Sequence, residues 1–184
     1  MWTDTVEEQR AERREKTRQL ITFSVSEEEF AVDISQVQEV IRLPNITVVP
    51  NAPDFIEGVI HLRGRIVPVI DLRKRLRLSR SAEPVSYDKY TRVLIILHEG
   101  KLIGFIVDKV TEILKIPESA VRPTPELVLE HTGAEYFDGV VREDDRLIIL
   151  LNLQRVLAPV EREQLEQIDI EAIKKLLQQH LKEK

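Results

Sequence analysis

Cysteine is absent from the 184 residues of this chain. Its absence excludes disulfides, thiol nucleophiles and metal sites built on thiolates, and it fits a reducing compartment. Long apolar runs are absent as well, since the longest are the five-residue stretches Val93–Leu97 and Leu147–Leu151. A membrane-spanning helix needs about 20 apolar residues, and residues 1–16 contain no apolar signal core. We therefore expect a cytoplasmic protein with no direct membrane insertion.

The patterns of common catalytic and cofactor sites are also missing. The glycines Gly58 and Gly64 are separated by β-branched residues with no helix start after them, so they do not form a phosphate-binding loop. No G-x-S-x-G motif occurs, and the acidic triplet Glu143–Asp145 falls in a predicted turn. The four histidines lie in four different predicted elements, without metal-ligand spacing: His61, His98, His131 and His180. We predict no catalytic residue, no metal, no cofactor and no enzymatic activity.

Positive charge is in the minority, with 27 Lys and Arg against 32 Asp and Glu, and the net charge is -5. This balance argues against a general nucleic-acid-binding protein. One local basic cluster stands out, and it contains Arg73, Lys74, Arg75, Arg77 and Arg80. The cluster is compatible with a solvated face, with contact to an acidic protein partner or, less favourably, with nucleic-acid binding by a small barrel. No aromatic residue lies between Phe55 and Tyr87 to support base stacking.

Three segments differ in composition. Residues 1–17 are almost all polar and predict a charged N-terminal tail, whereas 18–158 contain short apolar stretches typical of strands. Residues 159–184 predict a C-terminal amphipathic helix, whose apolar positions occur at helical spacing at Ile173, Leu176, Leu177, His180 and Leu181. That stripe could pack on the preceding domain, bind a partner or pair with a second copy.

The central segment contains an internal repeat. An offset of 73 aligns residues 18–25 with 91–98 and residues 37–44 with 110–117, and an offset of 81 aligns residues 56–72 with 137–153. The second copy therefore has eight extra residues between Pro117 and Gly139, around the loop-like sequence TPELVLEHTG. Two copies with about five short strands each predict a mainly β fold of two small barrels in tandem. We place the first subdomain at about 18–68, with a C-terminal return, and the second at about 69–150.

The sequence GVIHLRGRIVPVIDLR, residues 58–73, predicts a β-hairpin. Its turn is LRGR, in which Gly64 supplies the positive φ that such a turn often needs. Pro68 cannot donate a ladder hydrogen bond, so we expect its strand to lie at a sheet edge or to be bulged there. An exposed edge is a place where another barrel can add.

Two charged residues near this hairpin suggest a docking surface. Glu39 lies in the segment VQEVI and Arg63 lies in the turn, so adjacent packing of the two segments would join them in an ion pair. Ile34 and Val37 would add an apolar patch beside the charges. Apolar groups next to a positioned charge pair are typical of a specific protein interface. The alternative is that both are ordinary surface charges.

These stretches together resemble one family. The segments QLITFSV, FAVDISQVQEVIR, VPNAPDFIEGVIHLRGRIVPVIDLR and FDGVVREDDRLIILLNL are similar to those of bacterial chemotaxis coupling proteins, the CheW family. The resemblance covers about Gln19–Val156. The family's turn motif, Asn-Leu-Arg-Gly, stands here as His61, Leu62, Arg63 and Gly64, so the first position departs from the pattern.

The resemblance implies a fold and a function. It implies two intertwined SH3-like barrels of about five strands each, with short helices and no catalytic activity. It also implies an adaptor between the cytoplasmic hairpin tip of transmembrane chemoreceptors and the regulatory domain of the histidine kinase CheA, recruited to receptor arrays at the membrane. The protein-binding residues that it implies are Ile34, Val37, Glu39, His61, Leu62, Arg63 and Gly64. A CheW-like scaffold of a non-flagellar pathway, such as type IV pilus control, fits the same residues.

Overall fold

The computed structural model describes residues 16–76, 86–126 and 135–157, together with single positions in the C-terminal segment. Those positions, Glu161, Gln164, Lys175 and Gln178, are helical. The predicted tail 1–17 lies outside the described residues except for Lys16 and Thr17. The apolar stripe of the predicted helix 159–184 also lies outside them, as does most of TPELVLEHTG.

The described residues form strands joined by tight turns and short helices, which confirms the mainly β prediction. The strands are β1 (Thr17–Val25), β2 (Glu28–Asp33), β3 (Val37–Arg42), β4 (Ile56–Leu62), β5 (Arg65–Asp71), β6 (Arg92–His98), β7 (Lys101–Val107), β8 (Lys109–Pro117), β9 (Val121–Arg122), β10 (Phe137–Glu143) and β11 (Arg146–Leu151). The short helices are η1 (Ile34–Gln36), α2 (Leu72–Arg75), η2 (Glu118–Ala120) and η3 (Leu153–Arg155). None of the helices described is long and apolar enough to cross a membrane.

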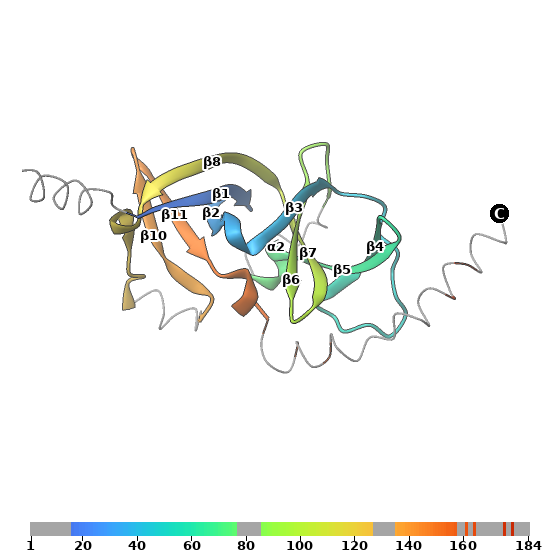
Figure 1. Ribbon diagram of the computed structural model, residues 1–184. Helices are drawn as coiled ribbons and strands as arrows, with labels where there is room; N and C mark the ends of the chain where they lie inside the picture. The colour runs from blue at the N-terminus through green and yellow to red at the C-terminus, as the bar shows by residue number, and fades with distance from the viewer. Residues whose placement is uncertain are drawn as a thin grey trace, which may run out of the picture.

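The strands form two sheets that lie side by side (Figure 1). The first sheet has the order β8-β1-β2-β11-β10-β9, and the second has the order β3-β6-β7-β5-β4. Each sheet builds one small SH3-like barrel, which we call barrel A for the first sheet and barrel B for the second. Most neighbours are antiparallel, but β2 pairs with β11 and β7 pairs with β5 in parallel.

The predicted repeat is present in the structure, but its strands are exchanged. Strands β1 to β5 of the first copy correspond in order to β6, β7, β8, β10 and β11 of the second. In barrel A the hairpin β1–β2 pairs with β8 and β11, and in barrel B the hairpin β6–β7 pairs with β3 and β5. The first hairpin of each copy therefore completes the barrel of the other copy.

The observed pairing differs from the predicted subdomain boundaries. A division at residue 68 would cut β5 in two, and residues 18–68 contribute strands to both barrels. The two copies are alike, so each first hairpin has two equivalent strands with which it can pair. The sequence pattern identifies the copies but does not distinguish pairing within a copy from exchange between copies.

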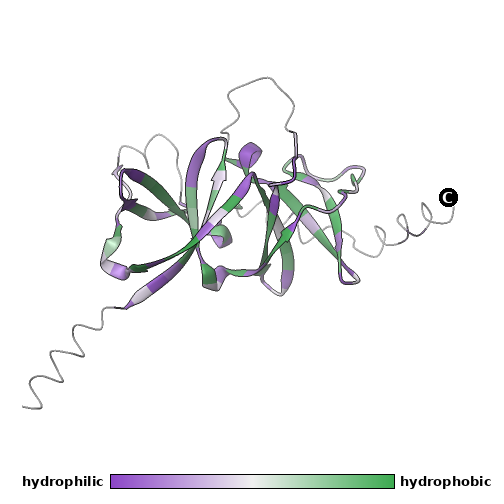
Figure 2. Cartoon of the chain, turned by 90° about the horizontal axis from the view of Figure 1, so that it is seen from above, coloured by the Kyte–Doolittle hydropathy of each residue, from purple (hydrophilic) through white to green (hydrophobic). Residues whose placement is uncertain are grey.

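A central apolar core holds the two barrels together. It includes Phe23 and Phe30 of barrel A with Leu94 and Phe105 of barrel B, all at most 2% exposed. Each barrel also has its own smaller core. Apolar positions follow the strands of both sheets, as Figure 2 shows in green, and polar positions occur at many of the turns. The exchanged hairpins supply most of the central core, so neither barrel can separate without exposing it.

The hairpin predicted at residues 58–73 is confirmed as β4 and β5. Of the two alternatives predicted for the strand that contains Pro68, the edge position is wrong, whereas the β4–β5 ladder does have a register shift nearby, between Ile56 and Gly58. Strand β5 lies between β7 and β4. Pro68 faces Val59 of β4, and pairing with β7 begins only at Val69. The missing N–H of Pro68 therefore interrupts no ladder with β7, which explains how proline is tolerated in a strand that has two neighbours.

Candidate protein-docking site

The candidate site is built on the tight turn between β4 and β5. Leu62 pairs with Arg65, which leaves Arg63 and Gly64 as a two-residue turn. Both turn residues have positive φ, 49° at Arg63 and 77° at Gly64, as in a type I′ turn. This turn type matches the twist of the strands, and glycine supplies the conformation at no steric cost. The turn places the Arg63 side chain at a fixed corner of barrel B.

Arg63 and Glu39 form the ion pair that the sequence predicted. The guanidinium donates from Nη1 to Oε1 of Glu39 at 3.1 Å and from Nη2 to Oε2 at 2.6 Å. The Glu39 side chain is 25% exposed, whereas that of Arg63 is 76% exposed. Two of the five N–H groups of the guanidinium are used, so the exposed remainder can donate to a partner.

This ion pair bridges the two edges of the second sheet. Strand β3, which carries Glu39, lies at one edge, and β4, which ends at the Arg63 turn, lies at the other. Barrel A has a similar ion pair, in which Glu112 corresponds to Glu39 and accepts from Arg146 Nη2 at 2.9 Å, although Arg146 corresponds in the repeat to Arg65 and not to Arg63. Arg146 also binds Glu29, and these acids raise the pKa of its guanidinium. Each barrel is therefore clamped by an arginine, but only Arg63 keeps most of its surface exposed.

The apolar members of the predicted site lie on a different face from the ion pair. The register shifts between Val37 and Glu39, so Val37 lies opposite Ile96 and Glu39 lies opposite Ile95. Ile34 and Val37 pack against the central core. Glu39 faces the same side as Ile95, which belongs to the core of barrel B. The structure brings Glu39 and Arg63 together but separates them from Ile34 and Val37, which pack against the central core.

The remaining members of the predicted set surround the turn. His61 is exposed near the end of β4, and Gly64 is exposed beside Arg63. Leu62 is half-buried and packs against the core of barrel B. Nothing lies within 4 Å of a Cβ built at Gly64, so its glycine is required by backbone conformation rather than by space.

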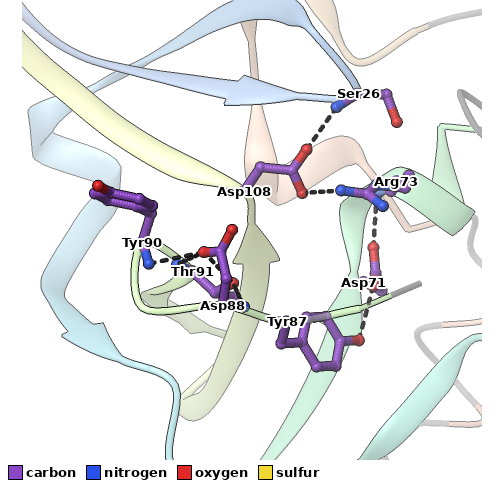
Figure 3. A network of polar contacts seen from close by, with 8 residues as sticks. All are labelled: Ser26, Asp71, Arg73, Tyr87, Asp88, Tyr90, Thr91 and Asp108. Carbon is purple, nitrogen blue, oxygen red and sulfur yellow. Dashed lines mark hydrogen bonds and ion pairs between the residues drawn. The ribbon is translucent and has the colours of Figure 1, made fainter.

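A polar network at the barrel junction was missed by the sequence prediction (Figure 3). Asp108 lies between β7 and β8, where the chain passes from barrel B to barrel A. It accepts from the Ser26 backbone N–H at 2.8 Å and from the Arg73 guanidinium at 2.5 Å. One carboxylate thus joins the β1–β2 turn to α2. No sequence signal marks this contact, because its partners are 82 and 35 residues away.

The basic cluster predicted at Arg73–Arg80 is neutralised where the structure describes it. Arg73 pairs with Asp108, Lys74 with Glu57 and Arg75 with Glu161. Arg77 and Arg80 lie outside the described residues. These ion pairs disfavour nucleic-acid binding by the cluster, and the Arg75 pair connects the C-terminal segment to α2.

Within the described residues, no group of three or more metal-ligating side chains is placed to hold a metal ion. A groove of about 410 Å³ lies near the start of β1. The groove is lined by Thr17, Arg18, Gln19, Asp33, Ile34 and Lys115, most of which are polar. Among them, only Ile34 belongs to the predicted site. Asp33 pairs there with Arg18 at 3.1 Å, and hydrogen bonds from Ser35 and Arg18 outweigh partial burial to lower the pKa of Asp33.

Residues 19–161 match the family model described as the CheW-like domain. The chain belongs to the CheW-like domain family. Among curated relatives, the chemotaxis protein CheW of Klebsiella aerogenes is 34% identical over 144 residues, which cover 78% of this chain and 84% of the relative. The chemotaxis protein CheW of Treponema pallidum is 34% identical over 148 residues, which cover 80% and 86% of the two chains.

A solved CheW structure has the same fold. The crystal structure of the scaffolding protein TtCheW from Thermoanaerobacter tengcongensis aligns with a TM-score of 0.68 and 34% identity. The alignment covers 78% of this chain and 89% of that one. The match confirms the predicted CheW-like family and fold, and it makes the chain a chemotaxis adaptor of the scaffold type.

Proposed function

We propose that this CheW-like chain is a non-enzymatic adaptor that couples transmembrane chemoreceptors to the histidine kinase CheA. In this proposal the cytoplasmic hairpin tip of the receptor and the regulatory domain of the kinase bind different surfaces of the same chain. The protein acts in the cytoplasm and is recruited to receptor arrays at the membrane. Family membership supports the proposal, and a surface with a positioned ion pair suits binding better than catalysis.

The Glu39–Arg63 pair is the observation that carries the proposed receptor site. Glu39 fixes the guanidinium of Arg63 by two hydrogen bonds, so little side-chain entropy remains to be lost when a partner binds. The N–H groups of Arg63 that do not bind Glu39 lie at a corner of barrel B where the side chain is exposed to solvent. His61, Leu62 and Gly64 border this corner, and Ile34 and Val37 support β3 from the central core.

Charge reversal at either residue tests this site. We expect Glu39→Lys or Arg63→Glu to weaken binding to a purified receptor cytoplasmic fragment at least tenfold, because each leaves a repulsive or unpaired charge. Exposed ion pairs contribute only about 0–1 kcal/mol to folding, so the unfolding midpoints should change little. Isothermal titration calorimetry would give the affinities and a thermal melt the midpoints.

Two further variants sharpen the test. The charge-swapped double variant, Glu39→Lys with Arg63→Glu, restores the direct pair but not the guanidinium donors, so its receptor affinity should stay low if those donors make the contact. Glu112→Lys is the matched control, because it breaks the corresponding clamp in barrel A and should leave receptor affinity unchanged. Unchanged affinity of both folded single variants would reject the assignment of this site.

A further inference from the structure

A second exposed cluster lies where β6 begins, around Tyr90 (Figure 3). Asp88 Oδ1 accepts from the backbone N–H groups of Tyr90 at 2.7 Å and Thr91 at 3.2 Å. Asp88 thereby fixes the turn, while the Tyr90 side chain remains 49% exposed. An aromatic ring held open to solvent on a rigid turn is suited to contact with a partner.

Cations gather around this ring. Lys89 Nζ lies 5.2 Å and Lys109 Nζ lies 5.5 Å from the ring centroid, within the range of cation–π attraction. The guanidinium of Arg92 donates to the carbonyl oxygens of Lys89 and Thr91, each at 2.9 Å. Arg42 lies directly opposite Arg92 in the β3–β6 ladder. We call Arg42, Lys89, Tyr90, Arg92 and Lys109 the Tyr90 patch.

No acid among the described residues balances the charges of this patch. Within the part of the chain that the structure describes, none of its four cations forms an ion pair. Like charges directly opposite each other in a sheet are destabilising, and Arg42 and Arg92 occupy such opposite positions. The chain carries more acidic than basic residues, yet the two acids adjacent in sequence to patch lysines bind elsewhere: Asp88 caps the turn, and Asp108 binds Arg73 and the Ser26 N–H. The arrangement is unfavourable for the free chain and becomes favourable when an acidic group binds.

We infer that the Tyr90 patch docks an acidic segment of one of the protein partners. This inference rests on the proposed adaptor function and names the chemistry of one contact. Val40 lies on the same face of β3 as Arg42, two residues away, and is 37% exposed. Exposed aliphatic and aromatic groups among cations favour a protein segment that combines acids with apolar residues over a lipid surface. The net charge of -5 disfavours nucleic acid.

The Tyr90 patch is separate from the Glu39–Arg63 site. Glu39 and Arg42 are three residues apart on β3 with no register shift between them, so their side chains leave opposite faces of the strand. One edge strand therefore contributes Glu39 to the ion pair on one face and Arg42 to the Tyr90 patch on the other. A partner at the patch can be recognised by charge independently of the Arg63 corner.

Charge removal in the full-length chain tests the inference. The test variant is Arg42→Gln/Lys89→Gln/Lys109→Gln. The control variant is Lys115→Gln/Arg122→Gln/Arg142→Gln, which removes three exposed cations from barrel A, including Lys115, the counterpart of Arg42. Binding of each chain to a receptor cytoplasmic fragment and to the CheA regulatory domain would be measured by calorimetry over a series of salt concentrations.

We expect the test variant to lose affinity for one of these partners by about tenfold near 0.1 M salt, with a shallower dependence on salt. The control variant should bind that partner as the original chain does. Arg42→Gln alone should weaken binding without lowering the thermal unfolding midpoint, because it relieves the contact with Arg92. A loss of binding without a loss of stability would separate a docking role from a structural one.

Other results would overturn the inference. The first is that the test variant and the original chain bind both partners with equal affinity. The second is that the test and control variants lose affinity equally. The third is that binding depends on the patch only for phosphatidylglycerol vesicles or an oligonucleotide. If the original chain binds both partners but the test variant is unaffected, the inference alone fails. If the original chain binds neither partner, the proposed adaptor function fails and the inference fails with it.

Discussion

Asp71 illustrates at the scale of one residue how a buried carboxylate is held at the barrel junction. Asp71 is only 3% exposed, and its carboxylate accepts hydrogen bonds from the Arg73 backbone N–H and the Tyr87 hydroxyl, each at 2.8 Å. Burial raises the pKa of Asp71, and the hydrogen bonds oppose that effect without cancelling it. Burial and the Asp71 charge likewise raise the pKa of Tyr87, which keeps the phenol protonated as a donor.

The raised pKa of Asp71 predicts a pH dependence of stability. The folded pKa lies above the unfolded value of 3.8, so the charged form costs folding free energy. The cost is absent below the unfolded pKa and is complete once the pH exceeds the folded pKa. The free energy of unfolding of the original chain, minus that of Asp71→Asn, should therefore fall as the pH rises through this window. Urea unfolding at pH values from 3 to 7 would measure it.

Asparagine is a suitable replacement at this position. Asn152 corresponds to Asp71 in the repeat and caps η3 through the same backbone contact, with its Oδ1 accepting from the Gln154 N–H at 3.0 Å. We expect Asp71→Asn to change stability at neutral pH by only about 1 kcal/mol, since one hydrogen bond with Tyr87 is altered. A stability difference that rises with pH would contradict the burial argument.

Contacts between single residues differed in how far the sequence could predict them. The Glu39–Arg63 pair could be predicted from the sequence, because the residues lie in a strand and a turn that were expected to pack side by side. The Asp108 contacts with Ser26 and Arg73 could not be predicted from the sequence, since they depend on how the two barrels are joined. The Tyr90 patch was also missed, because its cations come from β3, β6, β8 and the segment before β6.

At the scale of strands and hairpins, the exchange between the repeat copies is the main feature. The repeat offsets correctly matched β1 to β6, β3 to β8 and β4 to β10. The offsets could not show which strands pair, because β3 and β8 are equivalent in the repeat and either could form backbone hydrogen bonds with β1. The observed choice also buries the two first hairpins against each other in the central core, a gain that depends on the tertiary arrangement.

The exchange predicts that the two halves of the chain depend on each other for folding. A break between residues 80 and 81, in a segment outside the described residues, would give fragments that each lack the hairpin completing their barrel. We expect neither fragment alone to unfold cooperatively, because the central core loses half of its members. An equimolar mixture should regain a cooperative thermal transition and native amide exchange protection in β1 and β6.

The control for the broken chain is the intact protein measured at the same concentrations. The midpoint of the mixture should rise with concentration, whereas that of the intact chain should not. Two fragments that each melt cooperatively, with no gain on mixing, would show that the barrels are independent and would argue against the observed pairing.

At the scale of the whole molecule, the fold presents separate surfaces on a rigid pair of barrels. The Arg63 corner lies on barrel B, whereas the Tyr90 patch combines residues of barrel B with Lys109, the first residue of β8 in barrel A, and β3 contributes to both surfaces. Barrel A has a similar ion pair, Glu112 with Arg146, but leaves less of the arginine exposed. Approximate internal symmetry thus produces related edges with different chemistry, which fits the proposed adaptor, in which two different partners bind one chain.

The sequence predicted the family and its overall function better than it predicted the binding surfaces. Long matching segments from Gln19 to Val156 were sufficient to indicate the CheW family, which the comparisons confirmed. The individual contribution of Ile34, Val37, His61, Leu62 and Gly64 to binding stays a prediction. Surface chemistry depends on exposure and on unpaired charge, and a one-dimensional pattern does not report either quantity.

The most direct test of the adaptor proposal is a sedimentation measurement of bridging. Membranes that contain the chemoreceptor would be mixed with soluble CheA, with and without this chain, and the kinase in the pellet would be quantified. We predict that CheA sediments with the membranes only when the chain is present, and that the folded Arg63→Glu variant reduces this fraction strongly. Equal sedimentation of CheA without the chain, or binding of one partner that excludes the other, would contradict the proposal.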